Sequence, residues 1–218
     1  MVVTNVCAMH FLDEVRTFYD ALAPKHHGRM GTDLTKLPVE RDVLALFADL
    51  VGSGGRVLDA GCGPGAVTAH LASLGLAAEG LDLSASMLDL ARAAHPELSF
   101  RLGSLTALDA ADGSLDGVLA WYSLIHIPTD HRPAVMSELH RVLRPGGFLL
   151  LAFQVGDDVR HVRDPDGSHH ALDFFRLNPD TITAQLADAG FERVHLGVRE
   201  PQPPQEVVPQ AQIIARCS

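Results

Sequence analysis

The sequence predicts an α/β protein with a doubly wound, seven-stranded, mostly parallel sheet, helices on both faces and an antiparallel hairpin at the C-terminus. Apolar runs typical of buried strands alternate with helical segments between residues 56 and 154, and this order indicates βαβ units. Near the end of the chain, a proline-rich loop separates two further strand-like segments, which favours an antiparallel pair.

Each element has its own local signal. Strands are expected at 56–60, 76–83, 98–102, 114–122, 148–154, 192–200 and 210–217. Helices are expected at 10–22, 38–50, 66–75, 84–95, 129–144 and 178–190. Ser84 and Asn178 are the expected N-caps of two of these helices, and Thr129 or Asp130 is the expected cap of a third. Pro145-Gly146-Gly147 should end that third helix.

Composition restricts the possible partners. The chain has 218 residues and a formal net charge of -10 without a long basic run, which argues against nucleic acid or an anionic membrane as partner. Its three cysteines form no C-x-x-C pair, as expected of a protein in a reducing cytoplasm. We expect one domain over 1–218, as monomer or homodimer, with N-terminal helices (1–52), a cofactor-binding core (53–155), a substrate lid (156–176) and a C-terminal helix and hairpin (177–218).

A glycine-rich loop follows the first strand. "GCGPGA" at 61–66 satisfies the G-x-G-x-x-G/A fingerprint of dinucleotide sites, and Asp82 ends the next strand, where an acid binds ribose hydroxyls. A nicotinamide cofactor is therefore one reading. Two features argue against a phosphate in this loop: Pro64 has no N–H to donate, and the charge of Asp59 would repel it. In addition, compact one-domain dehydrogenases use a Tyr-x-x-x-Lys pair, whereas Tyr122 is followed four residues later by His126. A cofactor with a ribose, an ammonium group and no phosphate fits better.

Four segments in order carry a resemblance to a known family. "VLDAGCGPG", "GLDLSASMLDLAR", "GSLTALDAADGSLDGVLAWYSLIHI" and "ELHRVLRPGGFLLLAF" resemble the successive motifs of class I S-adenosylmethionine-dependent methyltransferases, chiefly those acting on small molecules. The resemblance covers roughly residues 15 to 218. It implies a Rossmann-like fold, S-adenosylmethionine as cofactor and a small-molecule methyl acceptor.

The resemblance also implies a set of cofactor residues. Gly61 and Gly63 would let the backbone approach the methionine part of the cofactor. Asp59 would face its ammonium group, Asp82 its ribose hydroxyls, and Tyr19 its carboxylate. The remaining residues expected at the cofactor are Cys62, Leu83, Met87, Ser104, Leu105, Ala120 and Trp121.

Cys62 and Met87 each have an alternative role, and Ser104 departs from the family pattern. Cys62 is either a reactive thiol or a small buried filler beside the cofactor. Met87 either lines the adenine pocket or belongs to the core. Ser104 stands where many members of the family carry an acid that accepts from the adenine amino group, so this contact is weakened here.

The acceptor is expected over the carboxyl ends of the fourth and fifth strands. There His126 would act as a general base or orient the acceptor, since imidazole titrates near neutral pH; the alternative is a structural role at a strand-to-loop corner. Trp121 and Tyr122 would form a wall of the acceptor pocket or pack within the strand. His169 and His170 would face the acceptor.

The polar segment 156–173 has two interpretations. Its histidines and aspartates suggest a metal site, but their spacing is irregular, so a lid that is mobile when empty is favoured and no metal is expected. For the whole chain, two alternatives to a methyltransferase stay open: a protein that binds S-adenosylmethionine without transferring its methyl group, and a nicotinamide-dependent oxidoreductase.

Overall fold

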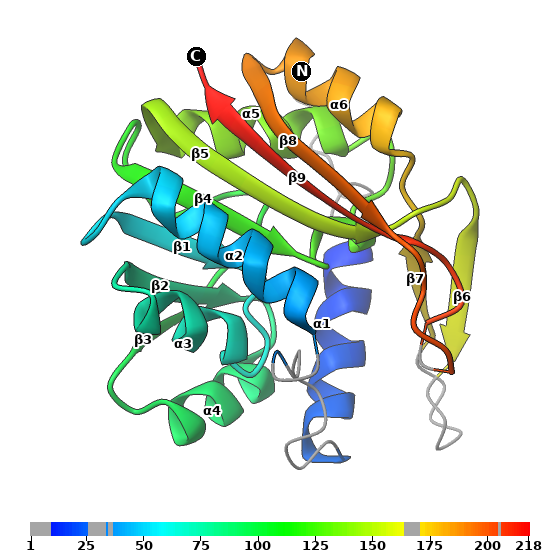
Figure 1. Cartoon of the computed structure of the whole chain (residues 1–218). Helices are drawn as coiled ribbons and strands as arrows, with labels where there is room; N and C mark the ends of the chain where they lie inside the picture. The colour runs from blue at the N-terminus through cyan, green and yellow to red at the C-terminus, as the bar shows by residue number, and fades with distance from the viewer. Residues whose placement is uncertain (1–9, 26–33, 35–36, 164–170, 205) are drawn as a thin grey trace, which may run out of the picture.

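A seven-stranded sheet forms the centre of the protein (Figure 1), with the strand order β3-β2-β1-β4-β5-β9-β8. The computed structural model describes residues 10–25, 34, 37–163, 171–204 and 206–218. The strands of this sheet are β1 (Arg56–Ala60), β2 (Ala77–Asp82), β3 (Ser99–Leu102), β4 (Leu115–Trp121), β5 (Leu143–Gln154), β8 (Phe191–Arg199) and β9 (Gln210–Cys217). The predicted fold class is confirmed.

The direction of the strands places the functional end of the sheet. Strands β1 to β5 run parallel, with β1 between β2 and β4, while β9 pairs antiparallel with both β5 and β8. From β1 the chain builds outward to β2 and β3, then returns to β4 on the other side. In open α/β sheets, ligands bind at such a reversal, outside the carboxyl ends of the strands.

Helices cover both faces of the sheet. They are α1 (His10–Leu22), α2 (Pro38–Val51), α3 (Ala66–Ser73), α4 (Ala85–Ala94), α5 (Arg132–Val142) and α6 (Pro179–Asp188). One large core packs α5 and α6 against alternate residues of β4, β5 and β9, and a second core packs α2 and α3 against the other face. None of the described helices combines the length and apolarity that crossing a membrane requires.

The helix caps follow the sequence in two of three cases. The Ser84 side chain accepts from the backbone N–H of Met87 at 3.1 Å, and Asn178 accepts from the first turn of α6. The prediction that Thr129 or Asp130 caps α5 is wrong, because His131 is the N-cap residue. Its N–H donates to the carbonyl of Pro128 at 3.0 Å, so the two predicted caps lie in a preceding turn.

Strand β5 begins earlier than predicted. Leu143 already pairs with Leu115, and the ladder resumes at Phe148 beside Gly117 after an irregular stretch. The Pro145-Gly146-Gly147 sequence therefore lies inside a bulged strand, rather than in a loop between helix and strand.

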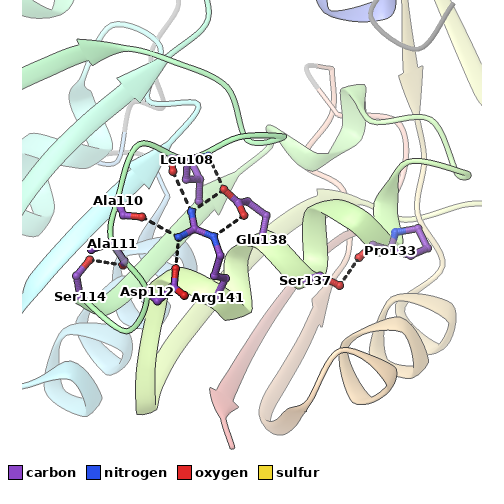
Figure 2. A network of polar contacts seen from close by, with 9 residues as sticks. All are labelled: Leu108, Ala110, Ala111, Asp112, Ser114, Pro133, Ser137, Glu138 and Arg141. Atoms are coloured by element: carbon purple, nitrogen blue, oxygen red, sulfur yellow. Dashed lines mark hydrogen bonds and ion pairs between the residues drawn. The ribbon is translucent and has the colours of Figure 1, made fainter. Parts of the chain in front are cut away.

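Arg141 of α5 fixes the loop that leads into β4 (Figure 2). Its guanidinium donates to the carbonyls of Leu108 and Ala110 and to the carboxylates of Asp112 and Glu138. Glu138 in turn accepts from the backbone N–H of Leu108 at 2.6 Å. These contacts anchor the start of β4, whose other end reaches the site described below.

The expected lid is partly a β-hairpin. Strands β6 (Val159–Arg163) and β7 (Ala171–Phe175) pair antiparallel, and residues 164–170 between them lie outside the described residues. This segment, expected to be polar, is not polar throughout, because Leu172 is buried, and just beyond it Phe174 and Phe175 pack against the main core.

Candidate active site

A cavity of about 750 Å³ opens at the carboxyl ends of β1 and β4, the position that the strand order indicates. Its walls come from α1 and α2, from the loops after β1, β2, β3 and β4, and from the β6–β7 and β8–β9 regions. A volume of this size suits one or two small molecules. The hydroxyl of Ser123, just after β4, donates to the carbonyl of Ala60 at 2.7 Å and ties the two strand ends together.

The backbone N–H groups of the glycine loop form hydrogen bonds within the protein. The N–H groups of Gly61 and Cys62 both donate to the carbonyl of Leu81, at 2.7 and 3.0 Å, and that of Gly65 donates to Cys62 at 3.0 Å. The Gly63 N–H donates to Asp82 at 2.8 Å. A pyrophosphate needs free N–H donors, and those of Gly61, Cys62, Gly63 and Gly65 are all engaged. The geometry therefore argues against a dinucleotide.

Asp59, which lines the same cavity, has an unsatisfied carboxylate oxygen. Its side chain is fully buried and lines the cavity, and its Oδ2 accepts from the Thr68 hydroxyl at 2.6 Å. Among the described residues, no group donates to its buried Oδ1. Burial, with a smaller contribution from the nearby Asp82 charge, raises the pKa of Asp59 to about 7, although hydrogen bonding from Thr68 opposes the rise. An ammonium group would satisfy this oxygen and its charge.

Asp82 ends β2 at the cavity wall. Its Oδ1 accepts from the N–H of Ser84 and its Oδ2 from that of Gly63, both at 2.8 Å. Burial raises the pKa of its carboxyl. Because each carboxylate oxygen has two lone pairs, both oxygens keep a lone pair for the hydroxyls of a ribose.

Most of the other predicted cofactor residues reach the cavity. The lining includes Tyr19, Cys62, Leu83, Met87, Ser104, Leu105 and Trp121. Ala120, also predicted at the cofactor, does not line the cavity, because its side chain is fully buried in the main core. Successive strand residues face opposite sides of a sheet, so its neighbour Trp121 lies on the cavity wall instead. The Ser104 hydroxyl lies 2.8 Å from that of Thr106, a local contact within its own turn.

His126 and Tyr19 contact each other. The Tyr19 hydroxyl lies 2.8 Å from Nε2 of His126, and Nδ1 faces the carbonyl of Asp173 at 3.5 Å. A carbonyl only accepts, which places the ring proton on Nδ1 and lets Nε2 accept from the tyrosine. Burial lowers the pKa of His126 to about 4, so the ring is neutral at pH 7.

This pairing favours one of the two roles predicted for His126. A general base needs a free ring nitrogen at the acceptor, whereas Nε2 is engaged and Phe174 packs edge-on against the ring at 4.7 Å. The contact also uses the Tyr19 hydroxyl proton. Binding of a carboxylate by Tyr19 would require that proton to turn away from His126.

Of the three residues predicted to contact the acceptor, the structure describes one, Tyr122. Tyr122 lines the cavity with an unusual backbone φ of 54°, a strained conformation of the kind found at ligand sites. His169 and His170 lie outside the described residues. Within the described ranges, no group of three or more histidine, cysteine, aspartate or glutamate side chains could hold a metal ion.

Sequence reasoning missed a second polar region of the cavity. Glu40 of α2, Arg199 at the end of β8 and Glu206 of the following loop line it, as do Arg160 and Arg176. A glutamate on the buried face of a helix was the only local signal, because the partners of Glu40 are far away in the sequence.

The site combines a strand-turn-helix loop whose N–H groups are engaged with one acid at the end of β1 and another at the end of β2. These features define the class of α/β proteins that bind a cationic, ribose-containing cofactor where the strand order reverses. Comparison with known proteins agrees, since residues 57–147 match the family described as "Methyltransferase domain". The chain is 32% identical over 168 residues to a ubiquinone biosynthesis O-methyltransferase of Xanthomonas oryzae pv. oryzae, covering 70% of this chain and 68% of that relative. The chain belongs to the S-adenosylmethionine-dependent methyltransferases.

Two further comparisons extend this result. A demethylmenaquinone methyltransferase of Renibacterium salmoninarum is 34% identical over 142 residues, which are 64% of this chain and 58% of that relative. The chain thus spans less than two thirds of the length of that relative. The crystal structure of a Burkholderia thailandensis 1,6-didemethyltoxoflavin-N1-methyltransferase, with S-adenosylhomocysteine bound, superposes with a TM-score of 0.72 at 20% identity. It covers 100% of this chain and 93% of the other, which establishes a shared fold.

Proposed function

We propose that this protein transfers the methyl group of S-adenosylmethionine to a small-molecule acceptor. The observation that carries the proposal is the pairing of a glycine loop whose N–H groups are engaged with the unsatisfied Oδ1 of Asp59. This site suits a cofactor that brings an ammonium group and no phosphate. When bound, S-adenosylmethionine supplies an electrophilic methyl group on a sulfonium.

The residues of the chain would bind and orient the two reactants. Asp59 would accept from the ammonium group and Asp82 from the ribose hydroxyls. A Cβ built on Gly63 meets no atom within 4 Å, so its absence leaves space for a ligand beside the backbone. We assign His126 the task of holding Tyr19 in place. Positioning of this kind is the main contribution that a protein makes to an in-line displacement.

Calorimetry with S-adenosylmethionine tests the proposal. We expect Asp82→Asn to weaken binding by about 2 kcal/mol, roughly 30-fold, because charge-assisted hydrogen bonds to hydroxyls are lost. Glu79→Gln is the control, since Glu79 lies on the same strand and pairs with Arg101. Unchanged affinity in Asp82→Asn, or tight binding of NADH by the native protein, would refute the cofactor assignment.

The acceptor requires a second experiment. Release of S-adenosylhomocysteine, measured over a panel of small hydroxyl- and amine-bearing compounds, would identify substrates. Cofactor binding without any turnover across the panel would favour the alternative of a protein that binds S-adenosylmethionine without transferring its methyl group.

A further inference from the structure

Three charged side chains that line the cavity, those of Glu40, Arg199 and Glu206, form a compact group. Arg199 donates through Nε to Oε1 of Glu40 at 2.6 Å. It also forms a two-point pair with Glu206, through Nη1 at 2.5 Å and Nη2 at 2.7 Å. The backbone N–H of Gln202 adds a donor to Glu206 at 2.8 Å. Two carboxylates share one guanidinium, so this group, which we call the Glu40 cluster, carries one excess negative charge.

The two carboxylates of the Glu40 cluster differ in how they are satisfied. Both oxygens of Glu206 have donors, and its side chain is 21% exposed. Glu40 is 1% exposed, and its Oε2 has no hydrogen-bond partner among the described residues. A buried carboxylate oxygen without a donor is unfavourable, and Glu40 lines the cavity. A ligand that brings a donor would complete the cluster.

Within the part of the chain that the structure describes, the other arginines that line the cavity do not supply that donor. Arg176 pairs with Asp158 at 2.9 Å, and Arg160 is exposed on β6. The apolar residues that line the cavity include Leu37, Val67 and Val207. Glu40 therefore adds a buried acceptor oxygen to a cavity whose walls carry both apolar and charged side chains.

We infer that Glu40 is an acceptor-binding residue and that the methyl acceptor offers its Oε2 an N–H or O–H donor from an amine or hydroxyl group on an apolar body. That the ligand is a methyl acceptor rests on the proposed function. Glu40 would set specificity by excluding molecules with a carboxylate at the same place, since two buried anions repel each other.

Benzylamine and benzoate are suitable probes because they share size and shape but present a cationic donor and an anion. Their binding is measured by calorimetry to the protein saturated with S-adenosylhomocysteine. We expect benzylamine to bind the native protein at least ten-fold more tightly than benzoate. In Glu40→Gln that preference should fall at least ten-fold.

Glu206→Gln is the matched control. It removes the same unit of charge from the Glu40 cluster but leaves Oε2 of Glu40 in place, so we expect a loss of benzylamine affinity at least five times smaller than in Glu40→Gln. Thermal unfolding and S-adenosylhomocysteine affinity of both variants show whether each is folded with its cofactor site intact. Equal losses in the two variants, or benzoate binding as tightly as benzylamine, would overturn the inference.

The two proposals fail separately. A protein that does not bind S-adenosylhomocysteine refutes the methyltransferase function, and the benzylamine preference is then measured on the free protein. A protein that binds S-adenosylhomocysteine but shows no preference that depends on Glu40 refutes only the role of Glu40.

Discussion

Asp59 is the residue at which folding and cofactor binding make opposite demands. In the folded protein its carboxyl is buried and accepts a hydrogen bond from the Thr68 hydroxyl. Its pKa is raised to about 7 from an ordinary value of 3.8. A folded-state pKa above the unfolded value means that protonation favours the folded state. The free protein therefore loses stability as pH rises from about 4 through 7, whereas a cation in the cavity favours the ionised carboxyl.

Asp59→Asn separates these two demands. The amide keeps an acceptor for Thr68 but has no charge. We expect the variant to be more stable than the native protein by about 2 kcal/mol or more at pH 8, with the difference shrinking toward pH 5. Urea unfolding of both proteins from pH 5 to pH 8 measures this, and other titrating groups cancel in the difference. A difference that does not change with pH would show that Asp59 ionises at its ordinary pKa. The variant should also bind S-adenosylmethionine more weakly.

At the scale of elements, the loop between β1 and α3 contains two glycines with different constraints. Both have positive φ, 91° at Gly61 and 52° at Gly63. A Cβ on Gly61 would clash with the side chain of Ser123, while one on Gly63 would enter open space at the cavity. Gly61 is therefore required by packing between two strand ends, whereas Gly63 is required only by its backbone φ and leaves open space where we expect the cofactor.

Alanine substitutions should distinguish these constraints. Gly61→Ala combines backbone strain with a clash, so we expect it to lower the free energy of unfolding by about 2 kcal/mol or more. Gly63→Ala carries strain alone, about 1 kcal/mol, but should weaken S-adenosylmethionine by at least ten-fold. Urea unfolding and calorimetry give the two quantities. The reverse ranking, with Gly63→Ala the less stable variant, would contradict this division of roles.

Elements that depend on local pattern could be predicted, and those that depend on distant contacts could not. The apolar run before Asp59 and the helix capped by Ser84 lie where the sequence indicates, because strand periodicity and cap chemistry act over a few residues. The pairing of β6 with β7 was not predicted, because the charged residues that alternate with the apolar ones in these strands make the segment look like a polar loop. Glu40 and Arg199 are 159 positions apart, and no pattern in one sequence joins two such residues. The contact of Tyr19 with His126 was missed for the same reason, although both were named.

At the scale of the whole molecule, the Glu40 cluster joins the N-terminal helices to the C-terminal hairpin. Glu40 lies in the first turn of α2, while Arg199 and Glu206 lie at the end of β8 and in the loop that leads to β9. These segments line the cavity from two ends of the chain. The shape of the pocket thus depends on ion pairs that form only when both ends have folded onto the sheet.

Arg199→Met should be strongly destabilising for this reason. The methionine keeps the apolar bulk of the side chain, but Glu40, 1% exposed, would then hold a buried charge without its cation. Removing one partner of a buried pair costs about 3 kcal/mol. Arg144→Met is the control, because it breaks the more exposed pair with Asp116 and should cost about 1 kcal/mol or less.

A double substitution then tests the cause of the loss. If the uncompensated charge of Glu40 is responsible, adding Glu40→Gln to Arg199→Met should recover part of the lost stability, because the amide can be buried at a lower cost than the carboxylate. Urea unfolding of the native protein, both single variants and the double variant closes the cycle. Strictly additive losses would mean that Arg199 stabilises the protein by packing alone. In that case apolar contacts would join the two ends of the chain, and the charge of the Glu40 cluster would contribute to ligand binding rather than to stability.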